Sequence, residues 1–131
     1  YLHTMLRVRD LDKSLDFYTN HLGMTLLRKN DFPGGKFTLA FVGYGDESSN
    51  TVLELTHNWD QEEPYEIGTG YGHIAFVVDD LDTTLDDLAV QGISPEKPPY
   101  TVSEGGSRLC FVRDPDGYRI ELIEGDPGRA D

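Results

Sequence analysis

The feature that most constrains the fold of this 131-residue chain is that its second half repeats its first. A shift of 70 positions places His3 on His73 and Asp10 on Asp80. The same shift matches a longer series, in which Val8, Leu11, Asp12, Leu15, Asp16, Leu39, Phe41 and Val42 fall on Val78, Leu81, Asp82, Leu85, Asp86, Leu109, Phe111 and Val112. Nearer the end the shift becomes 67, and Glu54-Leu55 falls on Glu121-Leu122. A repeat of this kind predicts two copies of one supersecondary unit.

We therefore expect an α+β fold of two tandem βαβββ modules, forming one domain over residues 1–131. The modules span 1–57 and 71–124, the linker is 58–70, and 125–131 is a C-terminal tail. The first module is expected to contain strands His3–Val8, Thr25–Arg28, Lys36–Val42 and Thr51–Thr56. The second is expected to contain strands His73–Val78, a short one near Ile93, Ser107–Val112 and Tyr118–Ile123.

One helix is expected in each module, directly after the first strand. Hydrophobic residues recur there at helical spacing: Leu11, Leu15, Tyr18 and Leu22 in one, and Leu81, Leu85 and Leu88 in the other. Asp10 and Asp80 suit the N-cap positions, and Gly23 and Gly92 suit the helix C-termini. The run Asp114-Pro115-Asp116-Gly117 predicts a tight turn between the last two strands, and the segment 97–106 predicts a loop.

The net charge of −13 limits the classes of partner. Nucleic acids and anionic membranes both favour a basic surface, so we expect neither as a partner. No apolar run approaches the roughly 18 residues of a membrane span, and no secretory signal is evident. Cys110, the only cysteine, lies in an apolar run and is expected to be a core residue. We expect a cytoplasmic protein. The excess of acidic residues also suggests adaptation to high salt.

Four residues at repeat-equivalent positions can bind a metal. His3 and His73 each begin a first strand, and Glu54 and Glu121 each lie on a last strand. Each residue alone could be an ordinary polar residue on a half-buried strand. Two imidazoles and two carboxylates at paired positions instead favour a site for Zn²⁺, Ni²⁺, Co²⁺, Mn²⁺ or Fe²⁺. His21 and His57 have no such equivalents, and we interpret both as non-ligands.

At these residues the chain resembles glyoxalase I, also named lactoylglutathione lyase, of the vicinal oxygen chelate superfamily. The resemblance covers nearly the whole chain. It is carried by the segments His3-Thr4-Met5-Leu6-Arg7-Val8, Leu39-Ala40-Phe41-Val42-Gly43-Tyr44-Gly45, Glu54-Leu55-Thr56-His57-Asn58-Trp59, Tyr71-Gly72-His73-Ile74-Ala75 and Asp114-Pro115-Asp116-Gly117-Tyr118.

The resemblance implies that the glyoxalase/bleomycin-resistance fold carries a metal site of His3, Glu54, His73 and Glu121. It implies a homodimer whose sites combine the first module of one chain with the second of the other. The implied reaction converts the hemithioacetal of glutathione and methylglyoxal into S-lactoylglutathione through an enediolate. By analogy Glu121 is the catalytic base and Glu54 faces the other side of the substrate.

Three residues are expected to hold glutathione. Arg7 and Asn58 match family positions for its γ-glutamyl end. The family arginine expected four residues before His73 is replaced by Thr69, so Arg108 and the segment 104–106 are candidates for the glycyl end. Because His3 stands where zinc-active members have Gln, the resemblance implies that Ni²⁺ or Co²⁺ is preferred, while Zn²⁺ binds with little activity.

Other readings within the superfamily remain open. A methylmalonyl-CoA epimerase shares the enolate chemistry but resembles the chain less around Glu54–Trp59. An extradiol dioxygenase needs two His and one carboxylate on iron, which leaves Glu54 surplus. A drug-sequestering protein of the bleomycin-resistance type needs none of the four ligands. A thiol other than glutathione is also open as cosubstrate.

Overall fold

The computed structural model describes residues 1–125, and the chain divides into two compact units. The first unit spans Tyr1–Glu66 and the second begins at Ile67, so the boundary falls inside the predicted linker. Each unit combines one β-sheet with one helical segment, which confirms the α+β class and the two-module repeat. The predicted tail lies outside the described residues, except for Gly125.

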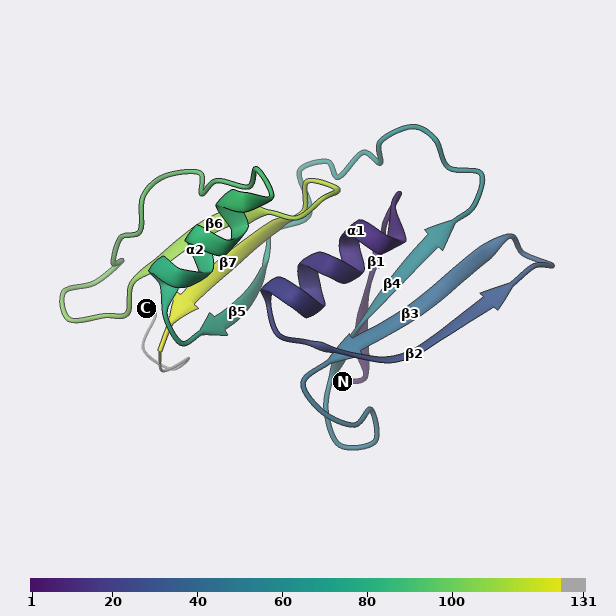
Figure 1. Cartoon of the computed structure of the whole chain (residues 1–131), viewed down its shortest axis with the longest axis horizontal. Helices are drawn as coiled ribbons and strands as arrows, with labels where there is room; N and C mark the ends of the chain where they lie inside the picture. Colours follow the sequence, from purple (N-terminus) through teal and green to yellow (C-terminus); the bar gives the residue numbers. More distant parts are fainter. Residues whose placement is uncertain (126–131) are drawn as a thin grey trace. The chain divides into compact units, whose positions relative to one another are not determined.

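In the first unit a four-stranded sheet carries one helical segment (Figure 1). The elements in chain order are β1 (His3–Arg7), α1 (Leu11–Asp16), η1 (Phe17–His21), β2 (Thr25–Phe32), β3 (Phe37–Gly43) and β4 (Val52–Asn58). The strand order is β1-β4-β3-β2. β1 runs parallel to β4, and the other neighbouring pairs are antiparallel.

The first helix begins as predicted but does not continue as one α-helix. The Asp10 carboxylate accepts a hydrogen bond from the Lys13 amide at 3.2 Å, and Gly23 has a φ of 78°. Between them the α-helix gives way to the π-helical turn η1, where the Leu22 amide donates to the Phe17 carbonyl at 3.2 Å. Two adjacent aromatic residues of this turn, Phe17 and Tyr18, are both buried in the core.

The second unit has a three-stranded sheet (Figure 1). Its elements are β5 (Ile74–Val78), α2 (Leu81–Val90), β6 (Leu109–Arg113) and β7 (Arg119–Glu124), with the strand order β5-β7-β6. Asp80 caps α2 by accepting from the Thr83 amide at 3.0 Å, and Gly92 follows the helix with a φ of 79°. In the predicted turn, Asp114 accepts hydrogen bonds from the amides of Asp116 and Tyr118.

The prediction of a strand near Ile93 was wrong, because no strand lies between α2 and β6 in the described chain. Prolines at positions 95, 98 and 99 supply no amide hydrogen, so this segment cannot form a continuous ladder. Two contacts tie it to β6: the Glu96 amide donates to the Phe111 carbonyl at 2.8 Å, and Tyr100 bridges Leu109. The second module is therefore βαββ, one strand short of the first.

Each sheet has two distinct faces. The helix packs on one face, where strand residues such as Leu53, Leu55, Ile120 and Leu122 are buried. Because side chains alternate along a strand, Glu54 and Glu121 point to the opposite face. We call this opposite face of each sheet the carboxylate face. In the first unit it carries His3, Met5, Arg7, Phe41, Glu54 and Asn58; in the second it carries His73, Ala75, Phe111, Arg119 and Glu121.

Candidate metal centre

A histidine and a glutamate meet on the carboxylate face of each unit. In the first unit Nε2 of His3 lies 2.8 Å from Oε1 of Glu54. In the second, Nε2 of His73 lies 3.2 Å from Oε1 of Glu121. Both pairs arise from the same strand pairing: in each unit the first strand runs parallel to the last strand, in equivalent register. The repeat in the sequence thus becomes a repeat of side-chain pairs.

The separation within each pair suits two ligands on one ion. Protein nitrogen and oxygen ligands lie about 2.0–2.2 Å from a first-row divalent metal, so neighbouring ligands of an octahedron are about 3 Å apart. The distances of 2.8 and 3.2 Å match that spacing. The glutamate side chains are only 13% and 14% exposed, whereas the histidines are 30% and 39% exposed. Each pair is therefore partly desolvated but reachable.

Neither unit gathers a complete metal site. Across residues 1–125, no group of three or more His, Cys, Asp or Glu side chains is close enough to hold an ion. Each unit brings together two of the four predicted ligands. Arg7 and Asn58 lie on the same face as His3 and Glu54, because they are spaced by even numbers along β1 and β4. Asn58 accepts a hydrogen bond from the Tyr65 hydroxyl at 3.3 Å.

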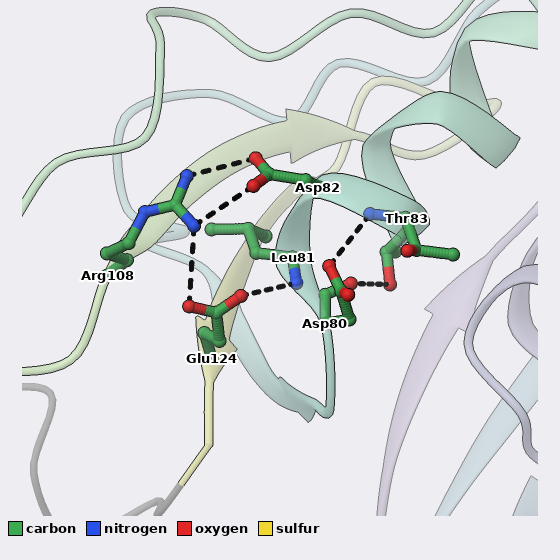
Figure 2. A network of polar contacts seen from close by, with 7 residues as sticks. Asp80, Leu81, Asp82, Thr83, Arg108 and Glu124 are labelled. Atoms are coloured by element: carbon green, nitrogen blue, oxygen red, sulfur yellow. Dashed lines mark hydrogen bonds and ion pairs between the residues drawn. The ribbon is translucent and has the colours of Figure 1, made fainter.

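Arg108 lies elsewhere, on the helix side of the second sheet. Figure 2 shows its guanidinium between two carboxylates, with Asp82 at 3.0 Å and Glu124 at 3.4 Å. Glu124 also accepts from the Leu81 amide at 2.7 Å, so the three residues tie β6 and β7 to the first turn of α2. This arrangement raises the pKa of Arg108 and lowers that of Asp82, chiefly through their mutual hydrogen bond. Arg108 therefore lies apart from the carboxylate face of its unit.

The other two histidines lie apart from the paired residues. His57 is on the helix side of β4, beside Thr38, and its Nδ1 lies 3.3 Å from the Val8 carbonyl. There it lines a pocket of about 340 Å³ together with Asp10, Asp12, Lys29 and Asp31, among others. His21 pairs with Asp16 at 3.2 Å.

A phenylalanine and an arginine that were not predicted as site residues accompany each pair. Phe41 lies opposite Glu54 in the strand register, and Phe111 lies opposite Glu121. The guanidinium carbons of Arg28 and Arg119 each lie 3.8 Å from the centre of the neighbouring phenyl ring. The match of Phe41 with Phe111 was visible in the repeat, but the arginines occupy unmatched positions and gave no such signal.

Cys110 takes no part in the site. It is fully buried in β6, and burial raises the pKa of its thiol to about 11. This agrees with the prediction of a core residue. Within residues 1–125 no helix is long and apolar enough to cross a membrane.

A family model decides the relationship of the chain. The model of the glyoxalase/bleomycin resistance protein/dioxygenase superfamily matches residues 1–122. The chain belongs to this superfamily. Within the glyoxalase superfamily it is 55% identical over 123 residues to a probable lactoylglutathione lyase of Synechocystis, covering 94% of this chain and 93% of the relative. It is 50% identical over 130 residues to the lactoylglutathione lyase of Escherichia coli O157:H7, covering 98% and 96%.

Solved glyoxalase structures agree with this relationship. The crystal structure of glyoxalase I from Zea mays superposes with a TM-score of 0.86 at 42% identity over 99% of this chain. The chain spans 44% of the length of that enzyme. The trypanothione-dependent glyoxalase I of Leishmania major superposes with a TM-score of 0.78 at 48% identity, covering 94% of this chain and 84% of the other.

Proposed function

We propose that the protein is a lactoylglutathione lyase that converts the methylglyoxal–glutathione hemithioacetal into S-lactoylglutathione. The observation that carries the proposal is the pair of His–Glu contacts, His3–Glu54 and His73–Glu121, each spaced as two ligands of one ion. Identities of 50–55% to lactoylglutathione lyases over nearly the whole chain support the same activity. A non-enzymatic binding protein would have no need of two such pairs.

In the proposed site His3, Glu54, His73 and Glu121 hold one divalent ion, which would stabilise negative charge on the two substrate oxygens. Glu121 removes the proton from C1 of the hemithioacetal and returns a proton to C2, so the reaction is an isomerisation with no net change in protons. Glu54 faces the other side of the substrate. The partial burial of both carboxylates strengthens their interactions with a bound ion and substrate.

Arg7 and Asn58 are proposed to hold the γ-glutamyl end of glutathione. Both lie on the carboxylate face with the first His–Glu pair, and a guanidinium suits a carboxylate through two parallel hydrogen bonds. For the glycyl end, the candidates are Arg108 and the segment 104–106, and we favour the segment because the guanidinium of Arg108 is already ion-paired. The protein is further proposed to act in the cytoplasm as a homodimer.

Ni²⁺ or Co²⁺ is the proposed metal. With His3 in the first position the site would offer an ion two imidazoles and two carboxylates, a mixed donor set that suits Ni²⁺ and Co²⁺, whose d electrons favour particular geometries. Zn²⁺ has no such electronic preference and often takes fewer ligands. It is therefore expected to bind but to support little turnover.

Reconstitution of metal-free protein tests the proposal. The apo-protein is loaded separately with Ni²⁺, Co²⁺ and Zn²⁺, occupancy is measured, and thioester formation from methylglyoxal and glutathione is followed in the ultraviolet. Activity with Ni²⁺ or Co²⁺ is expected, and equal activity with Zn²⁺ at full occupancy would overturn the metal assignment. A parallel assay with trypanothione in place of glutathione, motivated by the Leishmania relative, tests which thiol is the cosubstrate. Absence of turnover with every metal and both thiols would refute the proposed lyase activity.

A further inference from the structure

We propose that Arg28 and Arg119 are positioning residues, which fix the orientation of the metal-ligand histidines by clamping a phenyl ring against each imidazole. The inference rests on the proposed metal site. In each unit three groups form a stack on the carboxylate face: a guanidinium, a phenyl ring and an imidazole. The stack places the arginine on the phenylalanine and the phenylalanine against the histidine.

The two stacks have nearly the same geometry. In the first unit Arg28 lies 3.8 Å from the centre of the Phe41 ring, which meets His3 edge-to-face at 5.6 Å and 82°. In the second, Arg119 lies 3.8 Å from the Phe111 ring, which meets His73 at 5.1 Å and 79°. Edge-to-face pairs at such separations are favourable, and so is a cation over a ring face. Each phenyl ring is therefore held between a cation and an imidazole.

A carboxylate outside the metal pairs fixes each guanidinium. Arg28 donates to both oxygens of Glu47, at 2.8 and 3.1 Å. Arg119 donates to both oxygens of Glu96, at 2.9 to 3.1 Å. Such bidentate pairs set the plane of the guanidinium. The partner carboxylate also balances the positive charge of the guanidinium. We therefore attribute the role of each arginine to its stacking geometry and not to the electrostatic effect of its charge.

The duplication does not account for the arginines. Histidine, phenylalanine and glutamate are repeat-equivalent, but the position equivalent to Arg28 is Pro98, and the position equivalent to Arg119 is Val52. Arg28 comes from β2, the strand that the second unit lacks. Arg119 comes instead from β7, two residues before Glu121. The same stack is therefore built from different elements, which is what a functional requirement on the imidazole would produce.

Measurements of metal affinity distinguish a positioning role of the arginine from an effect of its positive charge. Co²⁺ is titrated into metal-free wild-type protein and the variants Arg119→Lys, Arg119→Met and Arg113→Met, with the d–d absorption bands as the readout. Loss of a residue that orients a ligand typically weakens metal binding about 10–100-fold. We expect that loss, and altered bands, in both Arg119 variants, because lysine keeps the charge but cannot stack as a plane. Arg113→Met is the matched control, since Arg113 also contacts Glu96, at 3.4 Å.

Each outcome decides one question. Wild-type affinity in Arg119→Lys together with weak binding in Arg119→Met would show that charge matters, and would overturn the positioning role. Wild-type affinity in both variants would overturn it as well. An equal loss in Arg113→Met would assign the effect to Glu96 and not to the stack. Failure of the wild-type protein itself to bind Co²⁺ would instead refute the proposed metal site. The same series with Arg28→Lys and Arg28→Met tests the first unit.

Discussion

At the scale of single residues, the two glutamates have similar environments but different proposed roles. Glu54 and Glu121 are exposed to almost the same extent and each contacts one histidine. Their difference in the proposed mechanism therefore depends on which side of the substrate each one faces. A substitution that preserves shape is the appropriate probe of that difference.

Glu121→Gln is expected to keep bound metal but to lose turnover by about 10²-fold or more, because glutamine supplies an oxygen donor but no base. Metal content and turnover are measured on the same preparation. Glu54→Gln serves as the comparison. Near-normal turnover in Glu121→Gln with loss in Glu54→Gln would move the base to Glu54.

Cys110 is expected to react slowly with thiol reagents in the folded protein. Its pKa of about 11 leaves roughly one thiol in a thousand ionised at pH 8, and the thiolate is the reactive form. Burial of the side chain adds a steric barrier. Absorbance of a disulfide reagent at pH 8, with and without denaturant, measures the contrast. Equal rates in the two conditions would show that the thiol is accessible in the folded chain.

At the scale of elements, the ion-pair network of Arg108, Asp82 and Glu124 fastens α2 to its sheet. Arg108→Ala is expected to lower the melting temperature only slightly, because the ion pairs of Arg108 are largely exposed and are screened by solvent. It should leave KM for the hemithioacetal unchanged, since Arg108 lies on the helix side. Thermal unfolding and steady-state kinetics provide the two readouts. A raised KM with unchanged stability would instead show that Arg108 takes part in substrate binding.

The elements that the sequence predicted are those whose signals are local. Caps at Asp10 and Asp80, glycines after the helices and the 114–117 turn all depend on neighbouring residues, and all were confirmed. The strand near Ile93 failed because its hydrophobic signal is weak beside three prolines. The change from α-helix to π-turn at Phe17 also had no local signal in the sequence.

The site residues also differ in whether the sequence carried a signal for them. His3, Glu54, His73 and Glu121 could be selected because the repeat pairs them, and the structure brings them together two by two. Arg119 could not be selected, because its contact with Phe111 depends on strand register. The face on which Arg108 lies could not be predicted, because the position at which β6 begins decides where its side chain points.

At the scale of the whole molecule, the proposed metal site draws its ligands from two units, so it can be tested by mixing chains. His3→Ala and Glu121→Ala chains are each expected to be inactive alone. If sites are shared between chains, half of randomly mixed dimers are heterodimers with one intact site of two, giving about a quarter of wild-type activity. Activity after co-refolding is the measurement. Proven heterodimers without activity would exclude shared sites.

The net charge of −13 leads to a prediction about salt. Self-repulsion of a strongly acidic chain is screened by added ions, so stability and activity are expected to hold or rise in molar KCl. Melting temperature against KCl concentration is the measurement. A steady fall in melting temperature with added KCl would remove the idea of salt adaptation.

The parallel pairing of first and last strands also has a consequence for biosynthesis. β1 pairs with β4 and β5 with β7, so each sheet closes only when the final strand of its unit is available. A chain emerging from the ribosome presents His3 long before Glu54, and His73 long before Glu121. An unfinished unit thus offers an imidazole without its carboxylate. The proposed four-residue metal site therefore cannot form before the last strand of both units has been synthesised and paired.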